Sequence, residues 1–386
     1  MDFEFSHEQK LLLDSVDAFM ARHLPPAEVR ARDAAADPPD HLLPLMGEAG
    51  FLGLPVPEEQ GGSGGDWRTM ALVQERLGYH ATIAAVLFNR VTCFGIMTLL
   101  TSGSARQQAE FLEALIAGRA SFALALSEPN AGSDAGGITS RARKTDAGWR
   151  INGRKTWISG AAAATRMVVA CRTGEAPRGH QGVTLFLVDP DAPGVSMTLL
   201  DKVGSRCSLS YDIGFDDVVV PDDAVVGVVD RGFDALRRTL FYARCGLSAA
   251  VVGTAQAAVD LALEHARTRH QFGRPIGSFQ AIAHRLARMQ TEVDQARLLT
   301  YRLAWLIDTG RPCDREAAQA KWSATETLKR VSEDGLQIMA SAGYAADSDM
   351  QRYWRDARLY TFGEGASEIQ LDLIARDMGV GERAAP

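Results

Sequence analysis

The sequence predicts an α+β fold in which two helical regions enclose a region rich in β-strands. Apolar residues recur every three or four positions in the first part of the chain and again after residue 231, which is the period of an amphipathic helix. Between them, short β-rich runs alternate with turn sequences, which indicates a compact β-barrel or sandwich. We therefore expect an N-terminal α-helical domain at 1–118, a central β-domain at 119–230 and a C-terminal helical bundle domain at 231–386.

Composition limits the classes of function. The chain has 386 residues, of which 46% are hydrophobic and 23% charged, enough for a large core. A net charge of -7 without a basic block argues against a nucleic-acid partner. Five widely spaced cysteines without a CxxC pair, and histidines without metal-ligand spacing, predict neither a disulfide framework nor a metal site. The N-terminus lacks a signal peptide and no apolar run is long enough to cross a bilayer, so we expect a cytoplasmic protein with no membrane span.

The N-terminal region begins with a capped helix. Ser6 and Gln9 form a capping box, and the helix continues until Pro25-Pro26 ends it. Further helices are expected at 41–49, 69–77, 81–100 and 105–117. The loop Gly61-Gly62-Ser63-Gly64-Gly65 matches the G-x-S-x-G pattern of a nucleophile elbow, but no strand precedes it, so we interpret it as a flexible turn.

The expected strands of the central region are separated by turn sequences such as Asn152-Gly153 and Asp189-Pro190. They lie at 122–126, 149–151, 167–171, 183–188, 196–200, 209–215 and 218–220. After residue 231, apolar stripes at 236–251 and 279–306 predict two long helices, which suit a bundle better than a lone surface helix. A third helix is expected at 314–340 and a fourth at 369–377.

One stretch, Leu124 to Asp134, combines a buried strand with a turn of small and hydroxylated residues. Pro129 ends the strand, and Gly132 lets the backbone approach a ligand closely. Exposed N–H groups in such a turn suit a phosphate, with Ser127 and Ser133 facing one bound molecule. Taken alone, the stretch is explained better by an ordinary junction between a strand and a turn.

Other residues also allow two interpretations. Trp157 offers a flat apolar face with the Ser159 hydroxyl close by, or it is a half-buried core tryptophan. Glu364, between two glycines and apolar neighbours, is a candidate general base with a raised pKa, or a solvated glutamate beside a helix N-terminus. Arg269 and Gln271 follow a long helix, where they could hold a diphosphate or simply end the helix.

These motifs together resemble the acyl-CoA dehydrogenase family over nearly the whole chain. The segments that carry the resemblance are Gly53–Gly62, Leu124–Asp134, Lys155–Ser159, Arg269–Gly273 with Phe279-Gln280, Gln337–Tyr344 and Arg355–Glu368. The resemblance implies that family's fold, with a C-terminal four-helix bundle, and non-covalently bound FAD in a homotetramer built as a dimer of dimers. It also implies an acyl-CoA or acyl-carrier thioester as substrate and a role in fatty acid or lipid catabolism.

The activity implied is the FAD-dependent α,β-dehydrogenation of an acyl thioester to the trans-2-enoyl thioester, an oxidoreductase reaction on a CH–CH group. Glu364 would remove the α-proton, the β-hydrogen would pass to the flavin as hydride, and an electron-transfer flavoprotein would accept the electrons. Some family members carry the base directly before the bundle arginine. Ala243 occupies that position here, which leaves Glu364 as the candidate base.

The resemblance also assigns residues to cofactor and substrate. Leu126, Ser127, Trp157 and Ser159 would contact the flavin ring, and Ser133 would lie near the diphosphate and the CoA moiety. Further cofactor contacts would come from Leu124, Gly132, Ile158, Ala366 and Glu368. Six more residues would reach the adenosine diphosphate half of FAD across a subunit interface: Arg269, Gln271, Phe272, Gln280, Gln337 and Ser341. Substrate contacts would come from Ser133, Arg244 and Gly365.

The sequence departs from the family pattern at several positions. Phe241 stands in place of an acidic residue, Ala340-Ser341 stands in place of a glycine pair, and Ala366 stands in place of a threonine. Gly363 replaces a bulkier residue and leaves room for a wider acyl group. Two further hypotheses therefore stand beside the dehydrogenase. One is a flavin oxidase or monooxygenase of the same fold, and the other is a flavin-poor, non-catalytic subunit of a hetero-oligomer.

Overall fold

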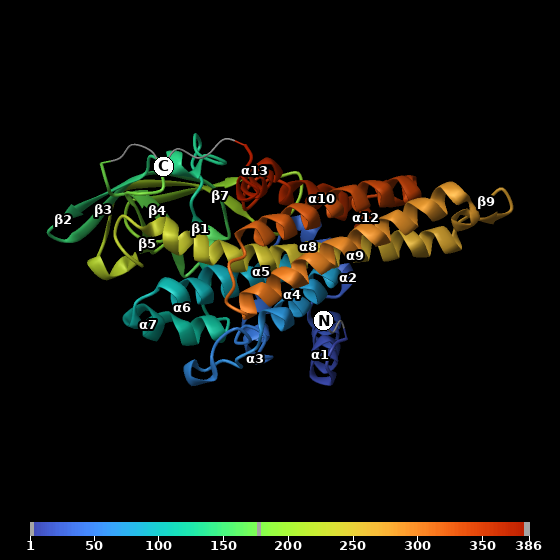
Figure 1. Ribbon diagram of the computed structural model, residues 1–386, viewed down its shortest axis with the longest axis horizontal. Coiled ribbons are helices and arrows are strands. Elements are labelled where there is room, and N and C mark those ends of the chain that lie inside the picture. The colour runs from blue at the N-terminus through green and yellow to red at the C-terminus, as the bar shows by residue number, and fades with distance from the viewer. Residues whose placement is uncertain (1–3, 176–178, 382–386) are drawn as a thin grey trace.

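A computed structural model describes residues 4–175 and 179–381. The molecule is elongated (Figure 1). The β-sheet lies at one end, and the long C-terminal helices run from it to a hairpin at the other end, labelled β9. The N-terminal helices pack along one side of this frame. This arrangement confirms the expected order of helical, β-rich and helical regions.

The N-terminal region is helical throughout, as predicted. Its helices are α1 (His7–His23), α2 (Pro26–Ala35), α3 (Leu42–Glu48), α4 (Trp67–His80), α5 (Thr82–Asn89), α6 (Thr98–Ser102) and α7 (Ala105–Ile116), with the short η1 (Glu58–Gln60). The Ser6–Gln9 capping box is present. The sequence did not predict α2, which starts directly after the first helix because a proline at the first helical position costs no hydrogen bond.

The helix expected at 81–100 is not uniform. Between α5 and α6 lies η2 (Arg90–Met97), a π-helical segment with a wider turn. Such segments are rare and are frequently found at functional sites. Here the segment turns Arg90 and Cys93 toward two different parts of the candidate site described below.

The central region forms one eight-stranded mixed sheet in the order β6-β7-β3-β2-β4-β5-β8, with β1 pairing in parallel with β4. The strands are β1 (Phe122–Ala125), β2 (Arg141–Thr145), β3 (Gly148–Ser159), β4 (Arg166–Arg172), β5 (Val183–Val188), β6 (Val195–Leu200), β7 (Ser210–Val220) and β8 (Val225–Val226). The short elements η3 (Ala135–Gly137), η4 (Ala161–Ala163) and η5 (Asp222–Ala224) connect them.

Two sequence predictions for the sheet are wrong. Asn152-Gly153 is not a turn but part of β3, where the pairing register with β7 shifts between Ile151 and Gly153. Gly153 has a φ of +148°, so it accommodates the irregularity within a continuous strand. The strands expected at 209–215 and 218–220 are likewise one strand, β7.

The C-terminal region is a bundle built on α8 (Gly232–Thr268), α9 (Gln280–Asp308) and α10 (Asp314–Met339). The hairpin of β9 (His270–Gln271) and β10 (Arg274–Pro275) and the turn η6 (Ile276–Ser278) join α8 to α9. After α11 (Ser341–Tyr344), the sequence missed α12 (Asp349–Tyr360), which buries Met350, Tyr353 and Ala357 in the same apolar cluster as α8 and α10. The predicted helix at 369–377 is present as α13 (Ser367–Asp377).

Two helical stretches are long and apolar enough to cross a membrane by composition, 82–102 and 232–268. Within the most apolar window of each, 78% of the residues are buried inside the protein. Both stretches therefore have the surroundings of core helices, and the absence of a membrane span stays a prediction.

Candidate active site

Glu364 lies in the turn between α12 and α13, on a strained backbone. Its φ is +54°, in the left-handed region, and the following Gly365 has a φ of +97°. The Ser367 hydroxyl ties the end of this turn to α10 by donating to Glu326 Oε1 at 2.7 Å. Strained non-glycine residues persist only where the surrounding structure holds them, and they concentrate at functional sites.

The Glu364 carboxylate points into the protein. The side chain is partly buried, and Oε2 is fully buried with no hydrogen-bond partner among the described residues. Burial raises the pKa of Glu364 to about 7, while the charges of Lys321 and Arg244 oppose that shift. A carboxyl group with a pKa near neutrality and a free acceptor oxygen has the properties of a general base.

Two cations stand beside this carboxylate on neighbouring helices. Arg244 on α8 has a buried Nε without a partner in the described part of the chain, and burial lowers its pKa. Lys321 on α10 is fully buried and donates from Nζ to the Gly365 carbonyl oxygen at 2.7 Å. Gln370 Nε2 donates to the same oxygen at 3.0 Å. Gly365, predicted to contact substrate, thus lies next to both the base and Arg244.

A second group of predicted residues gathers where β1 ends against β3. The Thr156 N–H donates to the Ser127 carbonyl at 2.9 Å, which brings Ser127 next to Trp157. The Trp157 side chain is 58% exposed on a residue whose φ is +60°. It is therefore not a core tryptophan. The Ser159 hydroxyl lies 3.0 Å from that of Ser210, so the segment presents an exposed indole flanked by hydroxyl groups.

The other predicted residues of this group differ in exposure. Leu124 and Leu126 are half-buried, and Gly132 and Ser133 are exposed in the turn that follows. Nothing occupies the space beside the Gly132 Cα, as close approach of a ligand requires. The Ile158 side chain is 2% exposed and packs in the sheet core. Its predicted contact with a cofactor would have to come from the backbone.

A buried ion pair between Lys155 and Glu128 holds the Ser127–Trp157 group in place. Lys155 Nζ donates to the Leu126 carbonyl at 2.9 Å and to Glu128 Oε1 at 2.8 Å. The Thr139 N–H and hydroxyl bond Glu128 Oε2 at 2.6 and 2.8 Å, and the Ser140 N–H bonds Oε1 at 2.9 Å. Glu128 and Lys155 therefore connect the turn after β1, the start of β2 and the middle of β3.

The segment η2 lies between the two groups. A Cβ at Gly160 would come within 2.1 Å of Arg90 Nη1, so this guanidinium packs on the backbone just after Ser159. One turn further along, Cys93 is near enough to Glu364 for the carboxylate charge to raise the thiol's pKa, although burial is the larger cause. The carboxylate and the Trp157 segment thus share η2 as a common neighbour.

The remaining predicted residues lie elsewhere. Arg269, Gln271, Phe272 and Gln280 are exposed on or beside the β9–β10 hairpin, and Phe272 is 92% exposed with a φ of +51°. The hairpin is the tip opposite the sheet (Figure 1). Arg244 and Arg269 are 25 positions apart, which along α8 corresponds to roughly 37 Å. One chain therefore does not bring the hairpin residues to the Ser127–Trp157 group.

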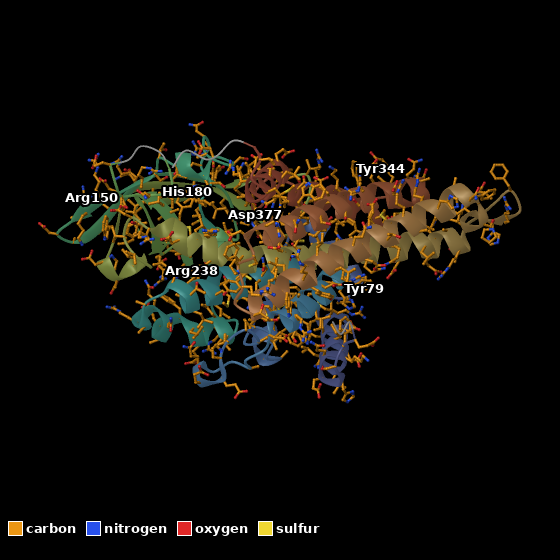
Figure 2. All side chains as sticks on the ribbon, in the orientation of Figure 1. Tyr79, Arg150, His180, Arg238, Tyr344 and Asp377 are labelled. Atoms are coloured by element: carbon orange, nitrogen blue, oxygen red, sulfur yellow. The ribbon has the colours of Figure 1, made fainter. Side chains whose placement is uncertain are left out.

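Gln337 and Ser341 line a surface cavity of about 430 Å³ on α10 and α11. Its other lining residues are Glu333, Leu336, Ala340, Tyr344 and Ala345. Tyr344 is 71% exposed and stands beside the C-terminal helices (Figure 2). Ala366 and Glu368 lie at the start of α13, directly after the Glu364 turn.

Sequence reasoning missed the roles of Lys155, Glu128 and Lys321. Lys155 and Glu128 lie inside segments that carry the resemblance, but their pairing depends on sheet contacts between residues 27 positions apart. The burial of Lys321 could have been inferred from the sequence, because this lysine lies on the same apolar face of α10 as Ala317, Ala320 and Ala324. A lysine in such a stripe is almost never fully buried without a partner.

Comparison with known proteins agrees with this geometry. Three family descriptions match the chain: "Acyl-CoA dehydrogenase, N-terminal domain" at residues 6–119, "middle domain" at 123–218 and "C-terminal domain" at 230–379. A probable acyl-CoA dehydrogenase, YngJ of Bacillus subtilis, is 38% identical over 98% of this chain and 100% of its own. CarC, a subunit of the caffeyl-CoA reductase–Etf complex of Acetobacterium woodii, is 33% identical over 96% of this chain and 98% of its own.

Solved structures are also similar. A glutaryl-coenzyme A dehydrogenase in complex with glutaryl-CoA superposes with a TM-score of 0.94 at 32% identity, covering 99% of this chain and 98% of the other. PigA with FAD and proline superposes with a TM-score of 0.93 at 27% identity, covering 98% and 99%. The family descriptions match all three regions, and relatives over 30% identical span nearly the whole chain. The chain is therefore an oxidoreductase that belongs to the acyl-CoA dehydrogenase family.

Proposed function

We propose that this chain catalyses the FAD-dependent α,β-dehydrogenation of an acyl-CoA thioester to the trans-2-enoyl thioester, with Glu364 as the base. The observation that carries the proposal is the buried, unpartnered Oε2 of Glu364 among the described residues, together with a pKa raised to about 7. An α-proton of a thioester is weakly acidic, so its removal needs a base that is ionised at neutral pH but not weakened by strong solvation.

The residues around Glu364 have separate tasks in this proposal. The strained turn aims the carboxylate inward, and burial keeps water from its Oε2. Arg244, a cation in the same pocket, would bind the phosphate or pantetheine part of CoA, with Gly365 and Ser133 as further substrate contacts. Within the described ranges its buried Nε has no partner, so the arginine has hydrogen-bonding capacity left for such a ligand.

The Ser127–Trp157 group fits the flavin of FAD. The exposed indole of Trp157 offers a face for ring stacking, and Ser127 and Ser159 offer polar groups beside it. Leu124, Leu126, Gly132, Ser133 and the Ile158 backbone would complete this half. Bound FAD supplies the acceptor for the hydride that leaves the β-carbon. The solved structure of PigA with FAD supports this cofactor for the fold.

The test is anaerobic bleaching of the purified yellow protein by a panel of acyl-CoA and acyl-carrier thioesters. We expect at least one thioester to bleach the wild type, and Glu364→Gln to keep its flavin spectrum but lose bleaching by at least ~10²-fold. Glu113→Gln is the control, because this exposed glutamate on α7 pairs with Arg119 at 3.0 Å and lies far from the turn in sequence. Bleaching of Glu364→Gln at the wild-type rate would contradict the proposal.

We further propose a homotetramer, built as a dimer of dimers, and the positions of the proposed cofactor residues support a second copy. Arg269, Gln271, Phe272, Gln280, Gln337 and Ser341 are distant from Trp157 along the chain's long helices, so a second copy would have to bring them to the same FAD. Ala366 and Glu368 would contact the cofactor from beside the base. Sedimentation of Phe272→Asp against wild type tests this, and an unchanged tetramer with unchanged FAD content would contradict it.

We also propose an electron-transfer flavoprotein as electron acceptor in the cytoplasm, in fatty acid or lipid catabolism. The name of the related CarC, a subunit of a complex with Etf, supports the acceptor. All five cysteines are unpaired and buried, which suits a reducing compartment. Reoxidation of the bleached enzyme by an electron-transfer flavoprotein tests the acceptor. Stoichiometric peroxide release in air, in preference to that transfer, would instead identify an oxidase.

A further inference from the structure

Lys321 holds the turn that carries Glu364, although it lies on another helix far away in sequence. Its side chain is 0% exposed, and its Nζ donates to the Gly365 carbonyl at 2.7 Å. Gln370 Nε2 donates to the same oxygen, so the peptide that follows the base is fixed from α10 and from α13. A burial this complete is costly for an ammonium group, and a single carbonyl bond does not offset it.

The charge of Glu364 nearby accounts for the burial of the Lys321 ammonium group better than the single hydrogen bond does. Burial lowers the pKa of Lys321 to about 8, and the largest opposing influence is the charge of Glu364. Weaker contributions come from Arg244, Glu326 and Glu368, of which Arg244 also lowers the lysine's pKa. Lys321 therefore stays charged at neutral pH beside a carboxylate that is itself near its midpoint.

The groups that face Glu364 come from several elements. Arg244 approaches from α8 and Lys321 from α10, and both favour the ionised carboxylate. Cys93 of η2 and Tyr360 of α12 are also within electrostatic range, but burial raises the pKa of both, so both stay neutral at physiological pH. The carboxylate thus has two charged neighbours in the described part of the chain, one of which we have assigned to the thioester's CoA portion.

We propose that Lys321 is a positioning residue: it fixes the Glu364–Gly365 turn through the Gly365 carbonyl and provides a positive charge beside the base while the proton is taken. This inference rests on the proposed function, in which Glu364 is the base. Without this cation, less positive charge would oppose the effect of burial, so the pKa of Glu364 would rise further and its carboxyl group would hold a proton more tightly.

Three substitutions separate the charge from the hydrogen bond. Lys321→Met removes both, Lys321→Gln keeps a donor for the Gly365 carbonyl without the charge, and Lys321→Arg keeps the charge. Lys144→Met is the control, since Lys144 is a lysine of the sheet whose exposed side chain pairs with Asp222, away from the residues of the candidate site. A merely structural lysine would lower thermal stability in all the neutral variants and leave the pH dependence alone.

The measurement is the rate of anaerobic flavin bleaching by a thioester as a function of pH, on FAD-loaded protein. We expect the midpoint of the rise in rate to move up by on the order of one pH unit or more in Lys321→Met and Lys321→Gln. Lys321→Arg should show a much smaller shift than the two neutral variants, and Lys144→Met should keep the wild-type midpoint. If Lys321→Met does not fold, Lys321→Gln carries the test.

The outcomes distinguish the two claims. Wild-type bleaching by the Glu364→Gln variant would remove both the proposed function and this inference. An inactive Glu364→Gln variant together with a wild-type midpoint in Lys321→Met and Lys321→Gln would overturn only the role of Lys321. A midpoint shift of equal size in Lys144→Met would also overturn it, because the effect would then not depend on a charge beside the base.

Discussion

The Lys155 ammonium group and the Glu128 carboxylate lie 2.8 Å apart with 0% and 4% of their side chains exposed, directly beneath the turn that contains Ser127. Burial lowers the pKa of Lys155. Burial would raise the pKa of Glu128, but the lysine and the donors of residues 139 and 140 outweigh it and lower that pKa to about 2. This pair joins the turn after β1, which we propose to contact the cofactor, to two strands of the sheet.

Lys155→Met should lower the free energy of unfolding by about 3–5 kcal/mol, because it leaves a buried carboxylate without its cation. FAD retention should fall as well, since the Leu126 carbonyl loses its donor. The double variant Lys155→Met/Glu128→Gln should recover part of the stability. Denaturant titration and flavin content after gel filtration measure these effects. Lys144→Met is the control, because its exposed pair with Asp222 should contribute under ~1 kcal/mol.

The same pair predicts a loss of stability in acid. The folded-state pKa of Glu128, about 2, lies below the ordinary glutamate value of 4.5. Its ionised form therefore stabilises the fold fully above pH 4.5, and this contribution is lost as the pH falls toward 2. Unfolding free energies measured at decreasing pH should fall more steeply for wild type than for Glu128→Gln. Parallel curves would show that this carboxylate does not contribute.

The wild-type rate of flavin reduction should rise with pH and reach half its maximum near pH 7. The pKa of Glu364 is raised to about 7 by burial, so the carboxylate is mostly protonated below that pH and ionised above it. Stopped-flow bleaching at thioester concentrations well below saturation measures the rise, because the rate there reports the pKa of the free enzyme. A midpoint near 4.5, the ordinary value for glutamate, would mean that the base is solvated during the reaction.

Trp157→Ala should weaken FAD binding far more than it weakens the fold. The side chain is 58% exposed, so its loss removes little buried surface, but it removes the flat face beside Ser127. We expect FAD affinity to fall at least ~10-fold, which corresponds to about 1.4 kcal/mol, with a nearly unchanged melting temperature. Trp305→Ala, which removes a 40% exposed tryptophan from α9, should change neither quantity strongly.

Ala340→Gly should stabilise the protein. Ala340 has φ of +50° and ψ of −132°, a conformation that is nearly restricted to glycine, and it joins α10 to α11 at the cavity that Gln337 lines. Relief of this strain should add on the order of 1 kcal/mol to the unfolding free energy. Ala345→Gly is the matched control, because Ala345 has ordinary extended angles, and the glycine there should lower stability slightly. A loss of stability in Ala340→Gly would contradict the assignment of strain.

The helices and most strands could be predicted because their periodicity is local. Ser6 with Gln9 capped α1, and 183–188 matched β5 at both ends. The error at Asn152-Gly153 has a physical cause: Asn-Gly favours a turn, but pairing of β3 with β7 on both sides of a bulge outweighs that preference. The failure to predict α12 is different, since Met350, Tyr353 and Ala357 have helical spacing that was readable in the sequence.

The candidate site was predictable only in part. Glu364, Trp157 and Ser127 were singled out from their neighbours in sequence and named by resemblance. The strain at Glu364 and Trp157, each at positive φ, could not be predicted, because neither residue type favours that conformation. The roles of Lys155 and Lys321 depend on partners 27 and 44 positions away in sequence, which no local pattern reveals.

Because α8 carries Arg244 within it and ends just before Arg269, this helix sets a fixed distance between the arginine proposed for the substrate and the arginine proposed for the cofactor of a second copy. A single inserted residue between them would turn one arginine by about 100° relative to the other and move it by about 1.5 Å. Homologues that keep both arginines in use should therefore tolerate no insertion or deletion between the two, although the exposed side chains of this 37-residue helix can vary.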